Sequence, residues 1–138
     1  MLDTNVLSEL IRASPSPVVL AWARAQDADA IFTTAVCEAE MLFGVAAMAE
    51  GRRQMALARA VDAILGTILG GRVLPFDENA GLIWARLMAG GKAQGRPRSA
   101  LDTIIAAVAE AHGCTLVTDN EKDFADIQVI NPLRGAVR

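Results

Sequence analysis

Histidine and cysteine are scarce in this sequence. Its 138 residues include one histidine, His112, and two cysteines, Cys37 and Cys114. A single histidine excludes a zinc site built from several imidazoles and a metal-free hydrolase that works with a histidine pair. The cysteines form no CxxC motif and lie in apolar segments, so we expect buried thiols rather than a disulfide or a metal pair. His112 ends a predicted helix, where the helix dipole favours a cation, and we expect it at the surface.

Long hydrophobic runs and a positive net charge are also missing. The longest apolar run, AILGTILGG at residues 63–71, is far shorter than the roughly 18 residues of a membrane span. With no basic-then-apolar signal pattern at its start, the sequence predicts a soluble, cytoplasmic protein without a membrane role. The formal net charge of −3 argues against broad electrostatic binding of nucleic acid. It leaves room for a site of clustered carboxylates, which needs divalent cations before a phosphate can approach.

The motifs of two large enzyme classes are absent. There is no GxSxG of a serine hydrolase, and GGK at residues 90–92 lacks the rest of a GxxxxGK[ST] nucleotide-binding loop. Neither internal repeats nor low-complexity segments occur, and 53% of the residues are hydrophobic. We therefore expect a single domain over residues 1–138, with Trp22 and Trp84 in its core or at an interface.

Helical and strand-like segments alternate along the chain. Capping residues and periodicity predict helices over residues 4–11, 17–26, 35–50 and 52–69, one after Asp77, and one from Ser99 to His112. Short strands are predicted at AIFTT, RVLPF, TLVT and DIQVI. This alternation is typical of parallel βαβ units and an α/β sheet covered by helices. Ligands bind at the carboxyl ends of such strands, where Asp3 and the pair Asp119-Asn120 fall.

Two predicted helices carry an acid on an apolar stripe. Glu40 shares its stripe with four small or apolar residues at helical spacing, namely Val36, Phe43, Gly44 and Ala47. Asp102 shares a stripe with Ile105, Ala106 and Ala109 in the same way. Both acids are therefore expected to face inward.

Each acid also has a purely structural interpretation. Ser99-x-x-Asp102 fits a capping box, and Asp3 can cap the helix that begins at Thr4. Glu40 can be a partly exposed acid if the buried face of its helix lies elsewhere. Capping is compatible with a functional role, and three such acids together favour a common site.

A cluster of buried carboxylates needs a cationic partner. The nearest basic residues, Lys92, Arg96 and Arg98, lie in a glycine-rich loop rather than among the acids. Metal is the simpler partner, because desolvated carboxylates repel one another unless they are protonated, paired or bound to a cation. Oxygen ligands select Mg²⁺ or Mn²⁺, and such a site permits phosphoester hydrolysis.

Five segments of the sequence, in order and spacing, resemble a known family. They are MLDTNVLSEL, TTAVCEAEMLFGV, GRVLPFDENA, SALDTIIAAVAEAHGCTLVTDNEKDF and VINP, and they resemble the PIN-domain toxins of VapBC type II toxin–antitoxin systems. The resemblance implies a three-layer αβα sandwich with a central, mainly parallel sheet of about five short strands. It also implies a Mg²⁺-dependent ribonuclease that arrests growth by cutting RNA, and a cognate VapB-type antitoxin that blocks it.

The resemblance carries over to individual residues. Asp3, Glu40 and Asp102 match the family's first three acids, which would be both catalytic and metal-binding. The fourth position holds Asn120, a neutral ligand at best, with Asp119 and Asp123 as neighbouring candidates. By their positions, Thr4, Asn5 and Thr118 are expected to be polar supports of the site. Relatives usually carry more residues before the first aspartate, so the first strand is expected to be short.

The resemblance further implies a homodimer and a toxin–antitoxin hetero-oligomer. The nearly all-apolar segments at residues 35–49 and 55–69 fit such contacts, with a fully buried helix as the alternative. Lys92, Arg96 and Arg98 are candidates for RNA contact, although exposed loop charge is their default interpretation. Two other functions stay open: a phosphatase or phosphotransfer domain with Asp3 as nucleophile, and a catalytically weak or inactive binding module.

Overall fold

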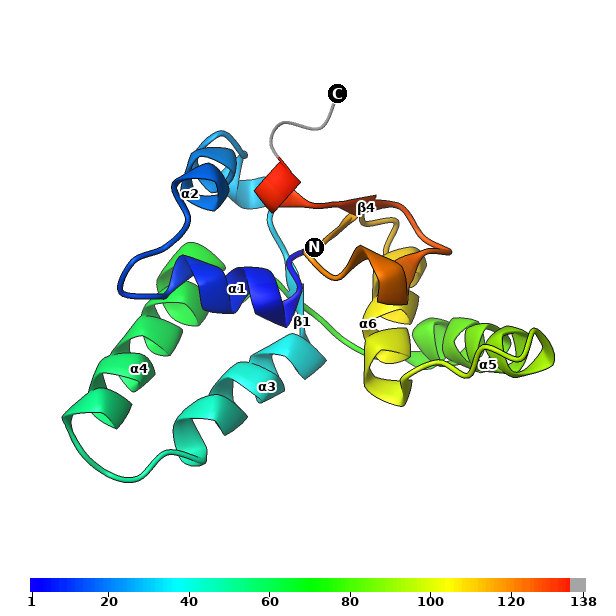
Figure 1. Ribbon diagram of the computed structural model, residues 1–138, viewed down its shortest axis with the longest axis horizontal. Helices are drawn as coiled ribbons and strands as arrows, with labels where there is room; N and C mark the ends of the chain where they lie inside the picture. Colours follow the sequence, from blue (N-terminus) through cyan, green and yellow to red (C-terminus); the bar gives the residue numbers. More distant parts are fainter. Residues whose placement is uncertain (135–138) are drawn as a thin grey trace.

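The capping residues of the sequence mark where most helices begin. Asp3, Thr34, Asp77 and Ser99 each accept a hydrogen bond from a backbone N–H in the first turn of the helix that follows. The computed structural model describes residues 1–134 (Figure 1). In chain order its elements are α1 (Thr4–Leu10), α2 (Pro17–Arg24), η1 (Ala28–Ala30), β1 (Thr33–Thr34), α3 (Ala35–Ala46), α4 (Arg52–Asp62), η2 (Ala63–Ile68), β2 (Val73–Leu74), α5 (Glu78–Ala93), α6 (Ala100–Ala111), β3 (Leu116–Val117), η3 (Glu121–Phe124), β4 (Val129–Ile130) and η4 (Pro132–Arg134).

The sheet is parallel and is joined in its middle by the first residues of the chain. β1 pairs with β2 and β3 pairs with β4, both in parallel. Leu2 connects the two pairs, because its N–H donates to the carbonyl of Phe32 (2.7 Å) and it forms a parallel bridge with Val117. The spatial order is thus β2, β1, Leu2, β3, β4. This order brings three residues to one edge of the sheet: Thr34, which ends β1, Asp3, which follows Leu2, and Thr118, which follows β3.

Helices cover both sides of these short strands. Figure 1 shows α1, α2 and α4 on one side of the strands and α5 and α6 on the other. The predicted three-layer αβα arrangement with a parallel sheet is therefore confirmed. Phe124, Leu7 and Ile105 are among the largest fully buried side chains, and Trp22 and Trp84 pack against this core as predicted. The last four residues of the predicted domain lie outside the described residues.

Several predicted boundaries shift in the structure. The four predicted strands are reduced to two residues each, and the helix predicted over residues 35–50 ends at Ala46. The helix predicted over residues 52–69 is α-helical only to Asp62. It continues as the π-helical segment η2, in which Leu69 N–H reaches back five residues to the carbonyl of Ile64 (2.9 Å). Within residues 1–134, no helix combines the length and the apolar character needed to span a membrane.

The predicted buried face of α3 is wrong. Phe43 was expected to face inward with Glu40, yet its side chain is 72% exposed, and Gly44 and Ala47 are exposed as well. The buried residues of α3 are Cys37 and Met41. The helix is apolar on nearly all sides, so periodicity could not select between neighbouring faces, and packing on α1, α4 and α6 decides. Glu40 is half-buried at the margin of the buried face.

The predicted face of α6 is correct. Ile105, Ala106 and Ala109 are buried, and Asp102 lies half-buried at the first turn. The helix ends at Ala111, and Gly113 then takes a positive φ of 63°, a conformation that glycine adopts without steric cost. His112 caps this end, 3.8 Å from Asp77 through Nε2 and Oδ2, with a side chain that is 25% exposed.

Candidate active site

Asp3 is the buried centre of the acidic site. It is the N-cap of α1 and is only 6% exposed. One carboxylate oxygen, Oδ1, accepts a hydrogen bond from the N–H of Thr4 (2.7 Å), and Oδ2 accepts one from the hydroxyl of Thr118 (2.8 Å). Asp3 therefore caps α1 as predicted. Its carboxylate is also buried at the edge of the sheet, away from solvent.

The surroundings of Asp3 raise the pKa of its carboxyl group. Burial raises the pKa of this carboxyl above its ordinary value, and the hydrogen bonds from Thr118 and Thr4 act in the opposite direction. The negative charges of Glu40 and then of Asp102 raise the pKa further. Of the two acids, Glu40 has the larger effect on the pKa of Asp3.

Glu40 reaches the site from α3 and is held by α1. The hydroxyl of Thr4 donates a hydrogen bond to Oε2 of Glu40. Thr4 thus has two tasks, because its backbone N–H binds Asp3 while its side chain orients Glu40. Thr4 and Glu40 are 36 positions apart in the sequence, so no local sequence pattern predicts this contact.

Asp102 reaches the site from the first turn of α6. Ser99 caps this helix through Oγ, which accepts a hydrogen bond from the N–H of Asp102 (3.3 Å). The reciprocal bond of a capping box, from the Ser99 N–H to the Asp102 carboxylate, is not formed. Within residues 1–134 the Asp102 carboxylate has no hydrogen bond or ion pair, so its oxygens stay available to a ligand.

Thr118 connects the polar side chains beneath the acids. It is fully buried; its hydroxyl donates to Asp3 and accepts hydrogen bonds from Asn5 Nδ2 (3.0 Å) and the Asn120 N–H (3.1 Å). Oδ1 of Asn5 is buried and has no partner among the described residues. The structure therefore places Thr4 and Thr118 in contact with Asp3, and Asn5 in contact with Thr118.

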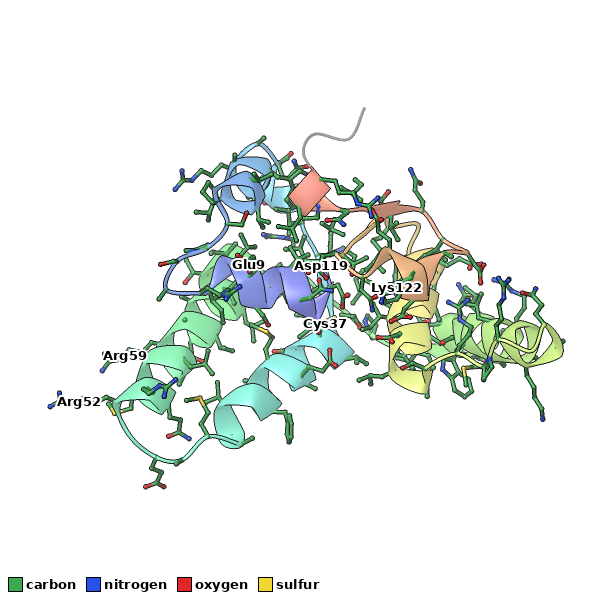
Figure 2. All side chains as sticks on the ribbon, viewed as in Figure 1. Glu9, Cys37, Arg52, Arg59, Asp119 and Lys122 are labelled. Atoms are coloured by element: carbon green, nitrogen blue, oxygen red, sulfur yellow. The ribbon has the colours of Figure 1, made fainter. Side chains whose placement is uncertain are left out.

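Asn120, at the position of the family's fourth acid, contacts a neighbouring side chain and not Asp3. The side-chain amide of Asn120 donates to Oδ2 of Asp123 (2.6 Å), and Asp123 is exposed. Asp119 is exposed too, and its side chain has no hydrogen bond or ion pair in the described part of the chain. Figure 2 shows Asp119 near the start of α1 and Cys37 at the start of α3. Neither Asp119 nor Asp123 is held against Asp3 by a contact of the kind that holds Glu40.

Cys37 lies at the site, which the sequence did not indicate. Its Sγ is 3.9 Å from Oδ1 of Asp3, and the side chain is fully buried. Burial, with smaller contributions from the charges of Asp3 and Glu40, raises the pKa of the thiol to about 11. The thiol is therefore protonated at neutral pH, which fits the predicted inert, buried cysteine. Its place three residues before Glu40 on one helix is the only signal in the sequence.

The three predicted RNA-contact residues differ in their surroundings. Lys92 and Arg96 are exposed, whereas the Arg98 side chain is only 12% exposed. Arg98 forms an ion pair with Asp126, and its Nε donates to Oγ1 of Thr103 (3.3 Å). Exposed loop charge therefore describes Arg96 but not Arg98. Lys92 is exposed, but it lies in the last turn of α5 and not in the predicted loop.

The acidic residues offer oxygen ligands without forming a closed cage. Within residues 1–134, no three His, Cys, Asp or Glu side chains gather closely enough to hold one ion. Mg²⁺ is commonly bound by one or two carboxylates while it keeps several waters and contacts substrate phosphates. The all-oxygen donor set and the unpartnered Asn5 Oδ1 fit such a cation, since its waters need acceptors nearby.

Comparison with known proteins places this arrangement in a family. The model of the PIN domain family matches residues 1–130. VapC ribonuclease Y4jK of Sinorhizobium fredii is 41% identical over 138 residues, which is 99% of either chain. Toxin FitB of Neisseria gonorrhoeae is 34% identical over 134 residues, 96% of either chain.

The fold gives the same result as the sequence. A chain in the structure of FitAB bound to an IR36 DNA fragment superposes with a TM-score of 0.86 at 35% identity, covering 95% of this chain and 93% of that one. The resemblance predicted from the five sequence segments is thus confirmed at the level of fold and family. The chain belongs to the PIN domain family.

Proposed function

We propose that this chain is the ribonuclease toxin of a type II toxin–antitoxin pair. It hydrolyses phosphodiester bonds of RNA in the cytoplasm with a divalent cation, Mg²⁺ first and Mn²⁺ as the alternative. The observation that carries the proposal is the buried carboxylate of Asp3 at the edge of the sheet, with Glu40 hydrogen-bonded to the Thr4 hydroxyl directly beside it. The names of two relatives, a VapC ribonuclease and a toxin, support the same activity.

Asp3, Glu40 and Asp102 would hold the cation partly through waters that it keeps, because the three carboxylates do not form a closed cage. The polar neighbours would orient them. Thr118 and the Thr4 N–H fix the two oxygens of Asp3, while the Thr4 hydroxyl fixes Glu40. Once bound, a divalent cation activates a water molecule and neutralises charge on the phosphate under attack. Asn120 is bound to Asp123 and is neutral, so one firmly held cation is favoured over two.

A partner would cover the apolar side chains that one copy of this chain leaves exposed. Leu42 (47%) and Phe43 (72%) on α3 and Met55 (54%) on α4 are large exposed hydrophobic residues. They fit a homodimer and a VapB-type antitoxin, because soluble monomers rarely expose apolar groups together. A single domain over residues 1–138 is part of the same proposal.

The proposal is tested on purified chain, free of antitoxin, with a mixture of cellular RNAs and Mg²⁺. Wild type should cleave, EDTA should stop cleavage, and Asp102→Asn should lower the rate about a thousandfold, since cation catalysis supplies several kcal/mol. Glu110→Gln is the matched control, because Glu110 is exposed on the same helix and pairs with Arg86 (2.5 Å). It should cleave like wild type.

A second readout does not depend on activity. Mg²⁺ should raise the melting temperature of wild type and of Glu110→Gln but not that of Asp102→Asn, because only an intact site binds the ion. Cleavage by Asp102→Asn at the wild-type rate would contradict the proposal. Wild type that leaves every RNA intact but binds its partner tightly would establish the binding module instead.

A further inference from the structure

A polar pocket opens beside Asp102. It has a volume of about 260 Å³ and is formed by the end of α5, the loop to α6, the first turn of α6 and the segment around η3. Charged and amide side chains dominate its lining, among them Gln94, Arg96, Arg98, Asp102, Lys122 and Asp126. Because Asp102 lines the pocket and belongs to the acidic site, a ligand that passes the acids can continue into it.

The loop wall of the pocket is fixed in place. The Arg96 N–H donates to the carbonyl of Gly91 (2.9 Å), and Arg98 is tied to Thr103 on α6 and to Asp126. A Cβ at Gly91 would lie 2.8 Å from both the Arg96 carbonyl oxygen and Cγ of Arg98. Residue 91 must therefore be glycine for the loop to lie this close to α5. The pocket is thus preformed, which lowers the cost of ordering it around a ligand.

The cations of the pocket divide into two kinds. The charge of Arg98 is neutralised by Asp126, and the contacts of Arg98 hold the loop in place. Arg96 and Lys122 line the pocket, are exposed, and form no ion pair within residues 1–134. Lys92 is exposed as well, but it does not line the pocket.

We propose that this pocket binds one nucleotide of single-stranded RNA next to the phosphodiester that is cut, with Arg96 and Lys122 on its phosphate. The inference rests on the proposed function, because it takes the acidic site as the place of cleavage. A recess of this size admits one unstacked nucleotide and not a duplex, and proteins that read RNA bind mainly splayed, single-stranded bases. Two unpaired cations are needed here, since the chain as a whole is negative and repels the RNA backbone.

The test measures RNA binding separately from cleavage. Asp3→Asn is used as the background, since asparagine also serves as an N-cap and the RNA stays uncut. The affinity for a fluorescent single-stranded RNA is measured by anisotropy in Mg²⁺ over a range of KCl. Arg96→Gln and Lys122→Gln should each reduce the slope of log K against log salt by about 0.7, the value for one lost phosphate contact on a single strand.

Two control variants remove the same charge elsewhere. Lys92→Gln takes it from the same end of α5, outside the pocket, and Arg59→Gln takes it from α4, far from the pocket in Figure 2. Both should keep the slope of the background. In the active chain, Arg96→Gln and Lys122→Gln should raise KM for single-stranded RNA several-fold and leave kcat unchanged, because they act on a bound nucleotide and not on the acids.

The outcomes separate this inference from the proposed function. Cleavage by wild type with unchanged slopes in Arg96→Gln and Lys122→Gln would overturn the pocket and leave the nuclease standing. An equal loss in Lys92→Gln would also overturn it, because diffuse charge would then explain the binding. A wild type that does not cut RNA, together with the reduced slopes, would reject the nuclease and support the pocket as an RNA site.

Discussion

Helices α3 and α6 each deliver one acid to Asp3, and they do so from opposite surroundings. α6 lies in the core, with an unbroken buried run from Ile105 to Ala109. α3 buries only Cys37 and Met41, and one side of it faces solvent. Yet the acid of the buried helix, Asp102, has a carboxylate without a hydrogen-bond partner in residues 1–134. The acid of the exposed helix, Glu40, is held by the Thr4 hydroxyl.

The difference shows two ways of positioning an acidic side chain. A helix packed on most of its circumference positions its own side chains, because its backbone has little freedom to move. A helix with few buried contacts unfolds locally more readily, so its acidic side chain needs a separate contact to hold it in place. On this view Asp102 is positioned by the packing of α6, and Glu40 is positioned by α1.

The largest expected effect breaks the core contact of α6. Ile105→Ala should lower the free energy of unfolding by about 2–5 kcal/mol, because a fully buried isoleucine leaves a cavity. Phe43→Ala on α3 should change it by about 0.5 kcal/mol at most, since its side chain is largely exposed. Urea unfolding is measured at a concentration where the chain is monomeric. Equal losses in the two variants would mean that α3 is packed as firmly as α6.

The same contrast explains what could be predicted from the sequence. The face of α6 was predictable because Ile105, Ala106 and Ala109 recur at helical spacing on one stripe, and all three are buried. The face of α3 was not, since Leu42 and Phe43 are as apolar as the buried Met41 and only tertiary packing separates them. The three acids were predicted as a site from their apolar surroundings and from the family resemblance, and that assignment stays a prediction.

The connections between the acids were beyond sequence reasoning. Thr118 contacts Asp3 across 115 positions, and Cys37 contacts the same carboxylate across 34. Neither contact can be predicted from hydrophobic periodicity, because periodicity relates only residues on the same helix or strand. The family pattern pointed to Thr4 and Thr118 as supports, but it did not say that Thr4 serves two acids at once.

A smaller effect is expected when the anchor of Glu40 is removed. Thr4→Val should lower kcat/KM for RNA about tenfold, or about 1.4 kcal/mol, since a hydrogen bond to a charged group is lost while the backbone N–H to Asp3 stays. Thr4→Ser keeps the hydroxyl and should retain near wild-type activity. Affinity for Mg²⁺, measured by calorimetry, should fall with Thr4→Val only. Full activity of Thr4→Val would show that α3 positions Glu40 unaided.

The smallest effect concerns the charge of Asp3, where the two helices act on one group. Burial is the main reason that the pKa of Asp3 is raised, and Glu40 adds more to it than Asp102 does. A raised folded-state pKa means that the contribution of Asp3 to stability is complete below the ordinary pKa of an aspartate. That contribution is lost as the pH rises through the folded-state pKa. In EDTA, Glu40→Gln should therefore lower the pKa of Asp3 and reduce this loss of stability.

Asp102→Asn should do the same to a lesser degree, because its charge acts more weakly on Asp3. Carbon-detected NMR titration of the Asp3 carboxyl, with unfolding measured over the same pH range, compares the two variants directly. Asp126→Asn is the control, since Asp126 is paired with Arg98 and is not among the groups that shift the pKa of Asp3. A larger shift from Asp102→Asn than from Glu40→Gln would reverse the comparison. The buried helix, rather than the exposed one, would then bring its carboxylate closer to the centre of the site.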